Sequence, residues 1–269
     1  MLDKKMTHQT GIKRLNYVRT GPVNLNPIVF LHAVGIDLGM WGQQIEAMQK
    51  HHDVIAYDLP GHGLSEKLAG DLTFENFADV ISKSIENLNC GPVNLAGISF
   101  GGMIAQKIAI RRPDLVKSLS LIGTACSFTE QVRTTLRERA DYVKNNGMKA
   151  IAPLSLSRWF TPEFALRRPD IIDNIKKMLY QQDSDYHSKI WDTISTLEMD
   201  VGLRGIDMPA LIIVGEDDKS TPLSSATALA QALKSTNIHL VTGSAHFTNL
   251  EAPETVNKLL LNFINSVHE

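Results

Sequence analysis

The stretch Gly97-Ile98-Ser99-Phe100-Gly101-Gly102 lies between an apolar run at 93–96 and a run of helical character at 103–110. A strand, a Gly-x-Ser-x-Gly turn and a helix, in that order, form a tight turn that lifts one serine hydroxyl above the edge of a sheet. Glycine at positions 97 and 101 removes side chains that would collide where the strand and the helix pass closely around the turn. The stretch therefore predicts a sheet flanked by helices, with Ser99 as a nucleophile.

The composition is that of an ordinary soluble protein. The 269 residues suit one large α/β domain, or one domain with an insertion. A net charge of −2 gives no electrostatic case for binding nucleic acid or an anionic membrane. Cys90 and Cys126 match no metal or redox spacing, and we expect reduced thiols. The N-terminus has no apolar core of a secretory signal, and the apolar runs are too short to cross a membrane, so we expect a cytoplasmic protein.

Short apolar runs alternate with amphipathic segments along most of the chain. This alternation is typical of βα units and predicts a mostly parallel central sheet flanked by helices. We expect strands at 15–19, 28–31, 54–57, 93–96, 116–122, 210–214 and 238–241. We expect helices at 40–50, 73–89, 103–110, 224–234 and 253–267.

The alternation stops between residues 127 and 203. This segment is rich in Arg, Lys, Trp and Met and has helical patterns without a good strand. We interpret it as a helical cap insertion, 127–203, over a core made of 1–126 and 204–269. Ordinary crossover helices are the alternative, but the segment is too long for a single crossover between adjacent strands.

A serine hydroxyl needs a base within hydrogen-bond reach to act as a nucleophile near neutral pH. After this type of turn the chain order is serine, acid, histidine. His32 and His62 follow strands but precede Ser99, whereas His246 follows the last predicted strand among small residues and precedes the last helix. The other histidines lie near a terminus, in polar stretches, inside a predicted strand or in the cap. His246 is the predicted base, and a surface histidine is the alternative.

The acid is expected directly after the strand at 210–214, where side chains meet at the carboxyl edge of the sheet. Asp217 and Asp218 both lie there, and spacing alone does not separate them. For the oxyanion we expect the backbone N–H groups of Phe100 and Val34, with His32 bracing the loop that holds Val34. Metal binding by His32, His62 and His246 is the alternative, but it lacks a cluster of ligands at short spacing.

These residues together resemble the α/β-hydrolase superfamily over essentially the whole chain. The matching segments lie at 31–35, 57–65, 97–102, 215–222 and 243–254. Members commonly carry Gly-x-x-Asp-x-x-x-Pro at the acid, and aligning Gly215 and Pro222 to that pattern selects Asp218. The resemblance implies an α/β-hydrolase fold and a Ser99, Asp218 and His246 triad that works without metal or organic cofactor.

Within the superfamily the chain is most similar to the 3-oxoadipate enol-lactonases. The segments that carry this similarity are 35–41, 99–104 and Arg158-Trp159-Phe160-Thr161-Pro162 in the cap. His32-Ala33-Val34 replaces the Ser- and Leu-containing loop of that family, a departure that concerns the acyl substrate and not the triad. The resemblance implies hydrolysis of a small carboxylate-bearing enol lactone to 3-oxoadipate during breakdown of aromatic compounds.

The cap contains candidate substrate contacts. Arg133, Arg137 and Arg158 are cations that could meet such a carboxylate, and solvated surface arginines are the alternative for each. The apolar side chains either line a pocket or pack the cap helices together; they are Trp159, Phe160, Met178 and Trp191. We select Trp159, Arg133 and Arg158 as predicted substrate-binding residues.

Three other functions remain open. A general carboxylesterase and a C–C bond hydrolase of ring-cleavage products use the same triad. A non-catalytic binding protein on the same scaffold is the non-enzyme alternative. Haloalkane dehalogenases and epoxide hydrolases have Asp at the position of Ser99 and are therefore disfavoured.

Overall fold

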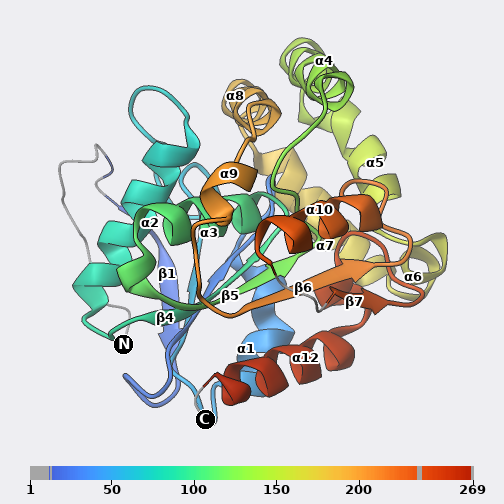
Figure 1. The fold of residues 1–269 in the computed structure, drawn as a ribbon. Helices are drawn as coiled ribbons and strands as arrows, with labels where there is room; N and C mark the ends of the chain where they lie inside the picture. The colour runs from blue at the N-terminus through green and yellow to red at the C-terminus, as the bar shows by residue number, and fades with distance from the viewer. Residues whose placement is uncertain (1–11, 13, 235–237, 268–269) are drawn as a thin grey trace.

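The computed structural model describes residues 12, 14–234 and 238–267 (Figure 1). The prediction that no secretory signal is present concerns the N-terminal stretch, which lies largely outside these residues. So do His8 and His268. None of the helices in the described ranges combines the length and hydropathy needed to cross a membrane.

The described chain builds a seven-stranded sheet in the order β1-β3-β2-β4-β5-β6-β7. β1 pairs antiparallel with β3, and the other neighbouring strands pair in parallel, so the predicted mostly parallel sheet is confirmed. The strands are β1 (Tyr17–Thr20), β2 (Ile28–Leu31), β3 (Val54–Tyr57), β4 (Val93–Ile98), β5 (Val116–Ile122), β6 (Ala210–Gly215) and β7 (Ile238–Val241).

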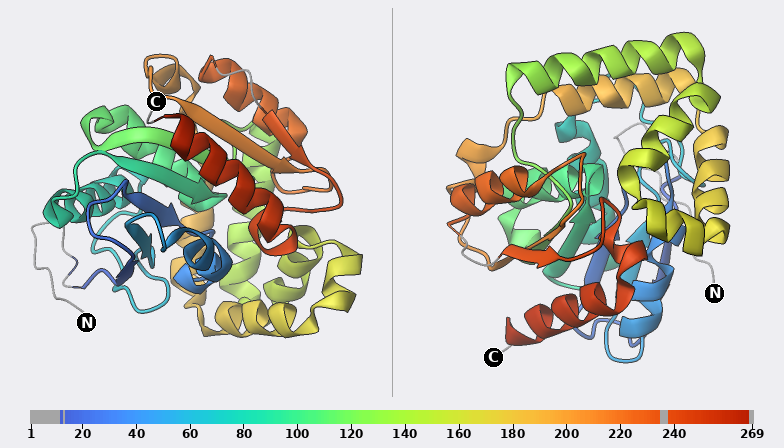
Figure 2. Two further views of the ribbon diagram at one scale, coloured as in Figure 1. Left: turned by 90° about the horizontal axis from the view of Figure 1, so that it is seen from below. Right: turned by 90° about the vertical axis from the view of Figure 1, so that its right-hand side faces the viewer.

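Helices cover both faces of the sheet, as Figures 1 and 2 show. On one face α1 (Gly42–Met48) packs against α12 (Pro253–Ser266). On the other face α2 (Phe74–Leu88) packs against α3 (Phe100–Arg111), and α10 (Leu223–Ala232) packs against β6. The shorter helices are η1 (Leu38–Trp41), η2 (Pro113–Leu115) and α11 (Thr248–Glu251).

Local sequence explains where several helices begin and end. Thr73 caps α2 by accepting a hydrogen bond from the backbone N–H of Asn76, and Asn89 ends the helix in the left-handed conformation. The helix expected at 40–50 is two elements, because Asp37 caps η1 by accepting from the N–H of Gly39 and the chain then continues into α1. Both starts use a short oxygen-bearing side chain.

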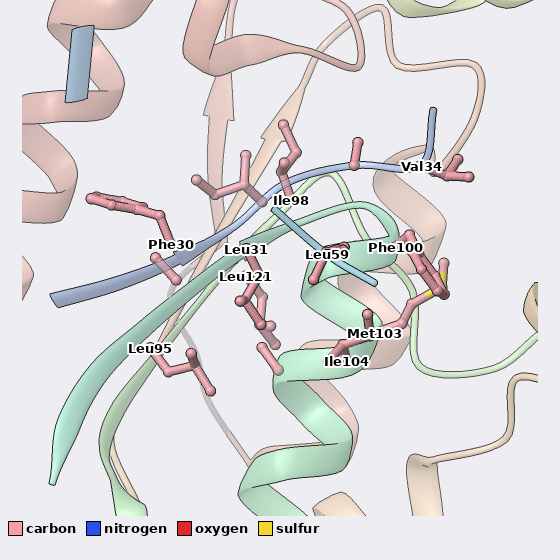
Figure 3. Close-up of a cluster of buried hydrophobic side chains, with 14 of the residues drawn as sticks. Phe30, Leu31, Val34, Leu59, Leu95, Ile98, Phe100, Met103, Ile104 and Leu121 are labelled. Atoms are coloured by element: carbon pink, nitrogen blue, oxygen red, sulfur yellow. The ribbon is translucent and has the colours of Figure 1, made fainter. Parts of the chain in front are cut away.

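The hydrophobic core lies between the sheet and its helices (Figure 3). Leu31, Leu95 and Leu121 come from the adjacent strands β2, β4 and β5, and each is fully buried. Ile104 of α3 packs in the same buried core. Strands buried on both faces are continuously apolar instead of alternating, which is why 28–31 and 54–57 could be recognised as short apolar runs.

Between β5 and β6, the regular elements of the described chain are helices. They are α4 (Glu130–Asn146), α5 (Met148–Trp159), α6 (Pro162–Arg167), α7 (Pro169–Gln181), α8 (Ser184–Ser195) and α9 (Asp200–Leu203). α4 and α8 run side by side, with α5 and α7 next to each other (Figure 2, right). An isolated bridge joins Ser127 to Glu198 at the base of this layer. α9 lies inside the expected cap limits of 127–203 but contacts the core helices α3 and α10.

The two cysteines play no part in holding this fold together covalently. Cys90 and Cys126 are both buried free thiols. Burial raises the pKa of each thiol, which keeps it neutral and weakly nucleophilic. Neither thiol is therefore a candidate nucleophile.

Candidate active site

Ser99 sits on a strained turn between β4 and α3. Its backbone has φ 52° and ψ −119°, a conformation that L-residues other than glycine rarely adopt. A Cβ atom at Gly97 would collide with the carbonyl oxygen of Gly101, and one at Gly101 would collide with that of Leu31. The backbone N–H of Ser99 donates to the carbonyl of Ile122 at 3.0 Å, which ties the turn to β5. The sequence therefore needs glycine on both sides of Ser99 for the strand, turn and helix to close.

Asp218 and His246 form a buried pair at the ends of β6 and β7. Oδ2 of Asp218 lies 2.9 Å from Nδ1 of His246, and their side chains are 0% and 2% exposed. Oδ1 of Asp218 accepts from the N–H groups of Ser220 and Thr221 at 2.8 and 2.9 Å, and Oδ2 accepts from the Thr221 hydroxyl at 2.9 Å. Asp217 is exposed instead. Of the two neighbouring aspartates, only Asp218 has its carboxylate within hydrogen-bond distance of His246.

The surroundings of Asp218 favour its ionised form. Burial by itself raises the pKa of this carboxyl, but the charge of His246 and the hydrogen bonds from His246, Thr221 and Ser220 outweigh it, so the pKa is lowered. An ionised Asp218 keeps the proton of His246 on Nδ1. Nε2 of His246 is then the nitrogen that remains available to accept a proton.

Two buried histidines brace the loop that follows β2. The N–H of Leu59 donates to Nε2 of His32 at 2.9 Å, and Nδ1 of His32 lies 2.7 Å from the carbonyl of Ala33. The N–H of Gly35 donates to Nε2 of His62 at 3.0 Å. Burial lowers the pKa of His32 to about 4 and that of His62 to about 3, so both rings are neutral and can accept these bonds. The contacts of His32 agree with the bracing role expected for it, and His62 adds a second brace.

Val34 and Phe100 were predicted to supply the oxyanion donors. Figure 3 shows Val34 beyond the end of β2, on the side of the core where α3 begins with Phe100. Val34 lines the same cavity as Ser99 and Met103. Phe100 is the first residue of α3, and an N–H at this position has no carbonyl four residues back within the helix. Both backbones are therefore beside the Ser99 turn, and their role as donors stays a prediction.

A cavity of about 800 Å³ lies between the turn that carries Ser99 and the helices of the predicted cap. Loops that follow β2, β4, β6 and β7 line its floor, through Val34, Ser99, Thr221 and His246. Helices α4, α5 and α8 line its roof. Ser99 is 9% exposed and His246 2%, so both are buried at the floor of this cavity. The cavity is large enough for a small-molecule ligand.

The predicted substrate-binding residues separate into two groups. Trp159 and Arg158 line the cavity, and Arg158 also donates a hydrogen bond to the carbonyl of Lys219. The guanidinium of Arg133 donates to the carbonyls of Phe128, Ser195 and Leu197 at 3.1, 2.8 and 2.8 Å. Arg133 thus ties the two ends of the predicted cap together and is not part of the cavity wall.

The remaining cap candidates also differ in place. Trp191 lines the cavity. Arg137 is exposed and pairs with Glu130. Phe160 stacks on Phe164, with ring centroids 5.4 Å apart, and Met178 lines a separate cleft beside η1. Packing of cap helices explains Phe160 better than contact with a ligand.

The sequence analysis did not select Arg139, which the structure places in the cavity wall. Val132, Thr135, Arg139 and Tyr142 all line the cavity from α4. These positions are three or four residues apart, which is the spacing of one helix face. Arg133 and Arg137 fall off this face. Helical periodicity within 130–146 could therefore have placed Arg139 on a different face from Arg133 and Arg137, but it does not say which face meets the cavity.

Metal binding gains no support from the side chains described. Within the described ranges, no group of three or more His, Cys, Asp or Glu side chains is arranged to hold a metal ion. The ring nitrogens of His32 and His62 are engaged with backbone groups, and Nδ1 of His62 lies 3.2 Å from the carbonyl oxygen of Pro60.

Comparison with known proteins identifies relatives over most of the chain. Residues 26–253 match a family model described as the alpha/beta hydrolase fold. An (E)-2-((N-methylformamido)methylene)succinate hydrolase from Acinetobacter baylyi is 32% identical, covering 87% of this chain and 88% of its own. 3-Oxoadipate enol-lactonase 2 from the same organism is 27% identical, covering 90% of each chain.

A solved structure agrees with these relatives. The crystal structure of the enol-lactonase from Burkholderia xenovorans is 28% identical, covers 93% of this chain and 96% of its own, and has a TM-score of 0.85. The resemblance to enol-lactonases found in the sequence is therefore confirmed. With its sheet order, its Gly-x-Ser-x-Gly turn and these matches, the chain belongs to the α/β-hydrolase family.

Proposed function

We propose that this protein is a serine hydrolase of a small lactone or ester, in which Ser99, His246 and Asp218 act as nucleophile, base and orienting acid. The observation that supports this most is the buried Asp218–His246 pair, 2.9 Å between Oδ2 and Nδ1, beside a cavity that His246 shares with Ser99. A serine hydroxyl on a strained turn, an imidazole and a buried carboxylate are the parts that acyl transfer requires.

In the first half of the proposed reaction, Nε2 of His246 takes the proton of the Ser99 hydroxyl as Oγ attacks the substrate carbonyl. Asp218 holds the imidazole in place and stabilises its charged form. The N–H groups of Phe100 and Val34 donate to the oxyanion. Loss of one such donor in other enzymes costs about 2.7–4 kcal/mol of transition-state stabilisation. The tetrahedral intermediate collapses as His246 returns the proton to the leaving oxygen.

In the second half, a water molecule takes the place of Ser99 Oγ as the nucleophile. His246 removes a proton from this water as its oxygen attacks the acyl carbonyl on Ser99. The second tetrahedral intermediate releases the carboxylic acid, and His246 returns the proton to Ser99. For a lactone the leaving oxygen stays in the same molecule, so ring opening gives a single product.

The substrate we favour is the enol lactone of 3-oxoadipate. Two Acinetobacter baylyi relatives carry the name 3-oxoadipate enol-lactonase, at 27% and 26% identity. The cap residues Arg158 and Trp159, which carried the sequence resemblance, line the cavity above Ser99.

A cytoplasmic location also stays a proposal from the sequence.

A second candidate substrate comes from the relative at 32% identity. Its name states hydrolysis of (E)-2-((N-methylformamido)methylene)succinate. Like 3-oxoadipate, this compound is named as a derivative of a dicarboxylic acid. The two candidates therefore require the same kind of cavity, one that holds a small derivative of a dicarboxylic acid.

Parallel turnover assays with the purified full chain test the proposal. The substrates are the enol lactone, the methylenesuccinate, p-nitrophenyl butyrate and a ring-cleavage dienoate. We expect the highest kcat/KM for the enol lactone. A higher value for p-nitrophenyl butyrate would identify a general carboxylesterase, and one for the dienoate a C–C bond hydrolase. Turnover of none of the four would favour the non-catalytic alternative.

A further inference from the structure

Arg139 is a cation without an acidic partner in the wall of the cavity. Its guanidinium lies over the ring of Trp191, with Cζ 4.3 Å from the ring centroid, and Nη2 donates to the Ser155 hydroxyl at 2.7 Å. Among the described residues, no carboxylate lies within ion-pairing distance of Arg139. Its Nε atom is buried and has no hydrogen-bond partner. A charge held this way is costly unless an anion joins it.

A second arginine increases this imbalance. Arg158 of α5 lines the same cavity, and so does Lys219. Burial, together with the positive charge of Arg158, lowers the pKa of Arg139 to about 10. The acidic residue in the lining is Glu138, which is exposed. Arg158 and Lys219 are exposed as well, so the lining as a whole has three cationic side chains, Arg139, Arg158 and Lys219, against one acidic side chain.

The contacts of Arg139 differ from those of an arginine with a structural role. Arg133, one turn and a half earlier on α4, donates to three backbone carbonyls. Arg139 is held by one hydroxyl and one aromatic ring, neither of which carries a negative charge. Stacking and a hydrogen bond fix the guanidinium in place but leave its charge unmatched. Such a rigid planar cation is suited to binding a carboxylate.

We propose that Arg139, together with Arg158, binds a free carboxylate of the substrate, so that this enzyme selects esters or lactones carrying a carboxylate remote from the carbonyl that Ser99 attacks. The inference rests on the proposed function only in taking Ser99 as the reacting end of the cavity. It deepens that proposal by assigning the carboxylate site to a residue that the sequence resemblance does not include. A carboxylate here separates two like charges and accepts charged hydrogen bonds from both guanidinium groups.

Binding of adipate, a six-carbon dicarboxylate, tests the assignment without requiring turnover. Isothermal titration calorimetry on the full chain compares wild type with Arg139→Gln and with Arg137→Gln. Arg137 is the matched control, since it is on the same helix, exposed and outside the cavity wall. 1,6-Hexanediol serves as the neutral probe of equal chain length. We expect wild type to bind adipate more tightly than the diol, and R139Q to weaken adipate binding about tenfold or more. R137Q should bind adipate as wild type does.

The proposal is wrong if wild type binds adipate no better than the diol, or if folded R139Q binds adipate like wild type. It is equally wrong if R137Q loses as much affinity as R139Q. If R139Q does not fold, Arg158→Gln decides, because Arg158 is exposed: unchanged adipate binding in R158Q overturns the proposal, and weaker binding supports it. Failure of the serine-hydrolase proposal would be seen separately, as absent turnover of every ester and lactone while adipate still binds.

Discussion

Ser99, Asp218 and His246 reach the site from loops that follow three different strands, β4, β6 and β7. Each loop holds its side chain in place in a different way. Ser99 needs a positive φ and glycine neighbours, whereas Asp218 needs the N–H groups of Ser220 and Thr221 to hold its carboxylate. The ring of His246 is oriented by Asp218, whose Oδ2 lies 2.9 Å from Nδ1.

Replacement of each of the two neighbouring aspartates by asparagine, one at a time, tests the role of Asp218. In Asp218→Asn, the proton on Nδ1 of His246 loses its anionic acceptor, and kcat is expected to fall by about 10⁴. Asp217→Asn is the matched control, since Asp217 is exposed, and its kcat should stay close to that of wild type. Steady-state kinetics on the favoured enol lactone measures both. Equal losses in the two variants, or a greater loss in D217N, would contradict the assignment.

Single site residues could be predicted from the sequence where the pattern that identifies them lies within a few neighbouring residues. Ser99 and its glycines form a local pattern, and His246 followed from chain order. Spacing could not separate Asp217 from Asp218, because in a tight turn adjacent side chains point in different directions. Arg139 was missed for another reason: the direction of an arginine on a polar helix depends on how α4 packs against α8 and α5.

At the scale of elements, Glu251 of α11 joins the cap to the loop that carries His246. One oxygen of its carboxylate accepts from both the N–H and the hydroxyl of Thr161, each at 2.8 Å, and Thr161 caps α6. The other oxygen accepts from the N–H of Ala245, next to His246, at 2.5 Å. Glu251 is nearly buried, so water cannot replace these bonds easily.

Removal of this carboxylate should destabilise the protein. Glu251→Ala leaves buried donors without acceptors, and we expect the free energy of unfolding to fall by about 2–4 kcal/mol. Glu254→Ala, at an exposed position of the adjoining helix α12, should change it by no more than about 0.5 kcal/mol. Denaturant unfolding of the two variants beside wild type measures this. An E251A protein as stable as E254A would show that the bonds contribute nothing.

Element boundaries were predictable where capping residues and apolar runs are strong. The strands at 28–31, 54–57, 116–122 and 238–241 have the expected limits. The short elements η2 and α11 were not predicted, since three or four residues carry too little periodicity. The packing of the cap helices could not be predicted from the sequence either, because several different helix packings are compatible with the same pattern of polar and apolar residues.

At the scale of the whole molecule, buried neutral histidines link stability to pH. Burial lowers the pKa of His32 to about 4 and those of His62 and His187 to about 3, from 6.5. In the unfolded chain these imidazoles take up protons near pH 6.5, whereas in the folded chain they do so only near pH 3–4. The unfolded state therefore binds more protons within this window, and stability falls as the pH falls through it. The pKa of Asp218 is lowered from 3.8, so its contribution to stability stays intact above about pH 4 and is lost only as the pH falls further.

Unfolding by guanidinium chloride at pH 7 and pH 5 should show this loss. Each imidazole contributes at most about 1.4 kcal/mol per pH unit toward the acid side of the window. His62→Gln removes one titrating ring and should make the pH dependence shallower, while His51→Gln, at an exposed position, should leave it as in wild type. Equal stability of wild type at the two pH values would contradict the buried, neutral state of these rings.

The central claim is that Ser99 is the nucleophile of a hydrolase, and covalent labelling tests it most directly. Wild type and Ser99→Ala are treated with a fluorophosphonate, and peptide mass spectrometry locates the adduct. The account predicts one adduct, on Ser99, and none in S99A, whose turnover should fall by several orders of magnitude with the fold retained. An adduct on another residue, or wild-type turnover by S99A, would contradict it.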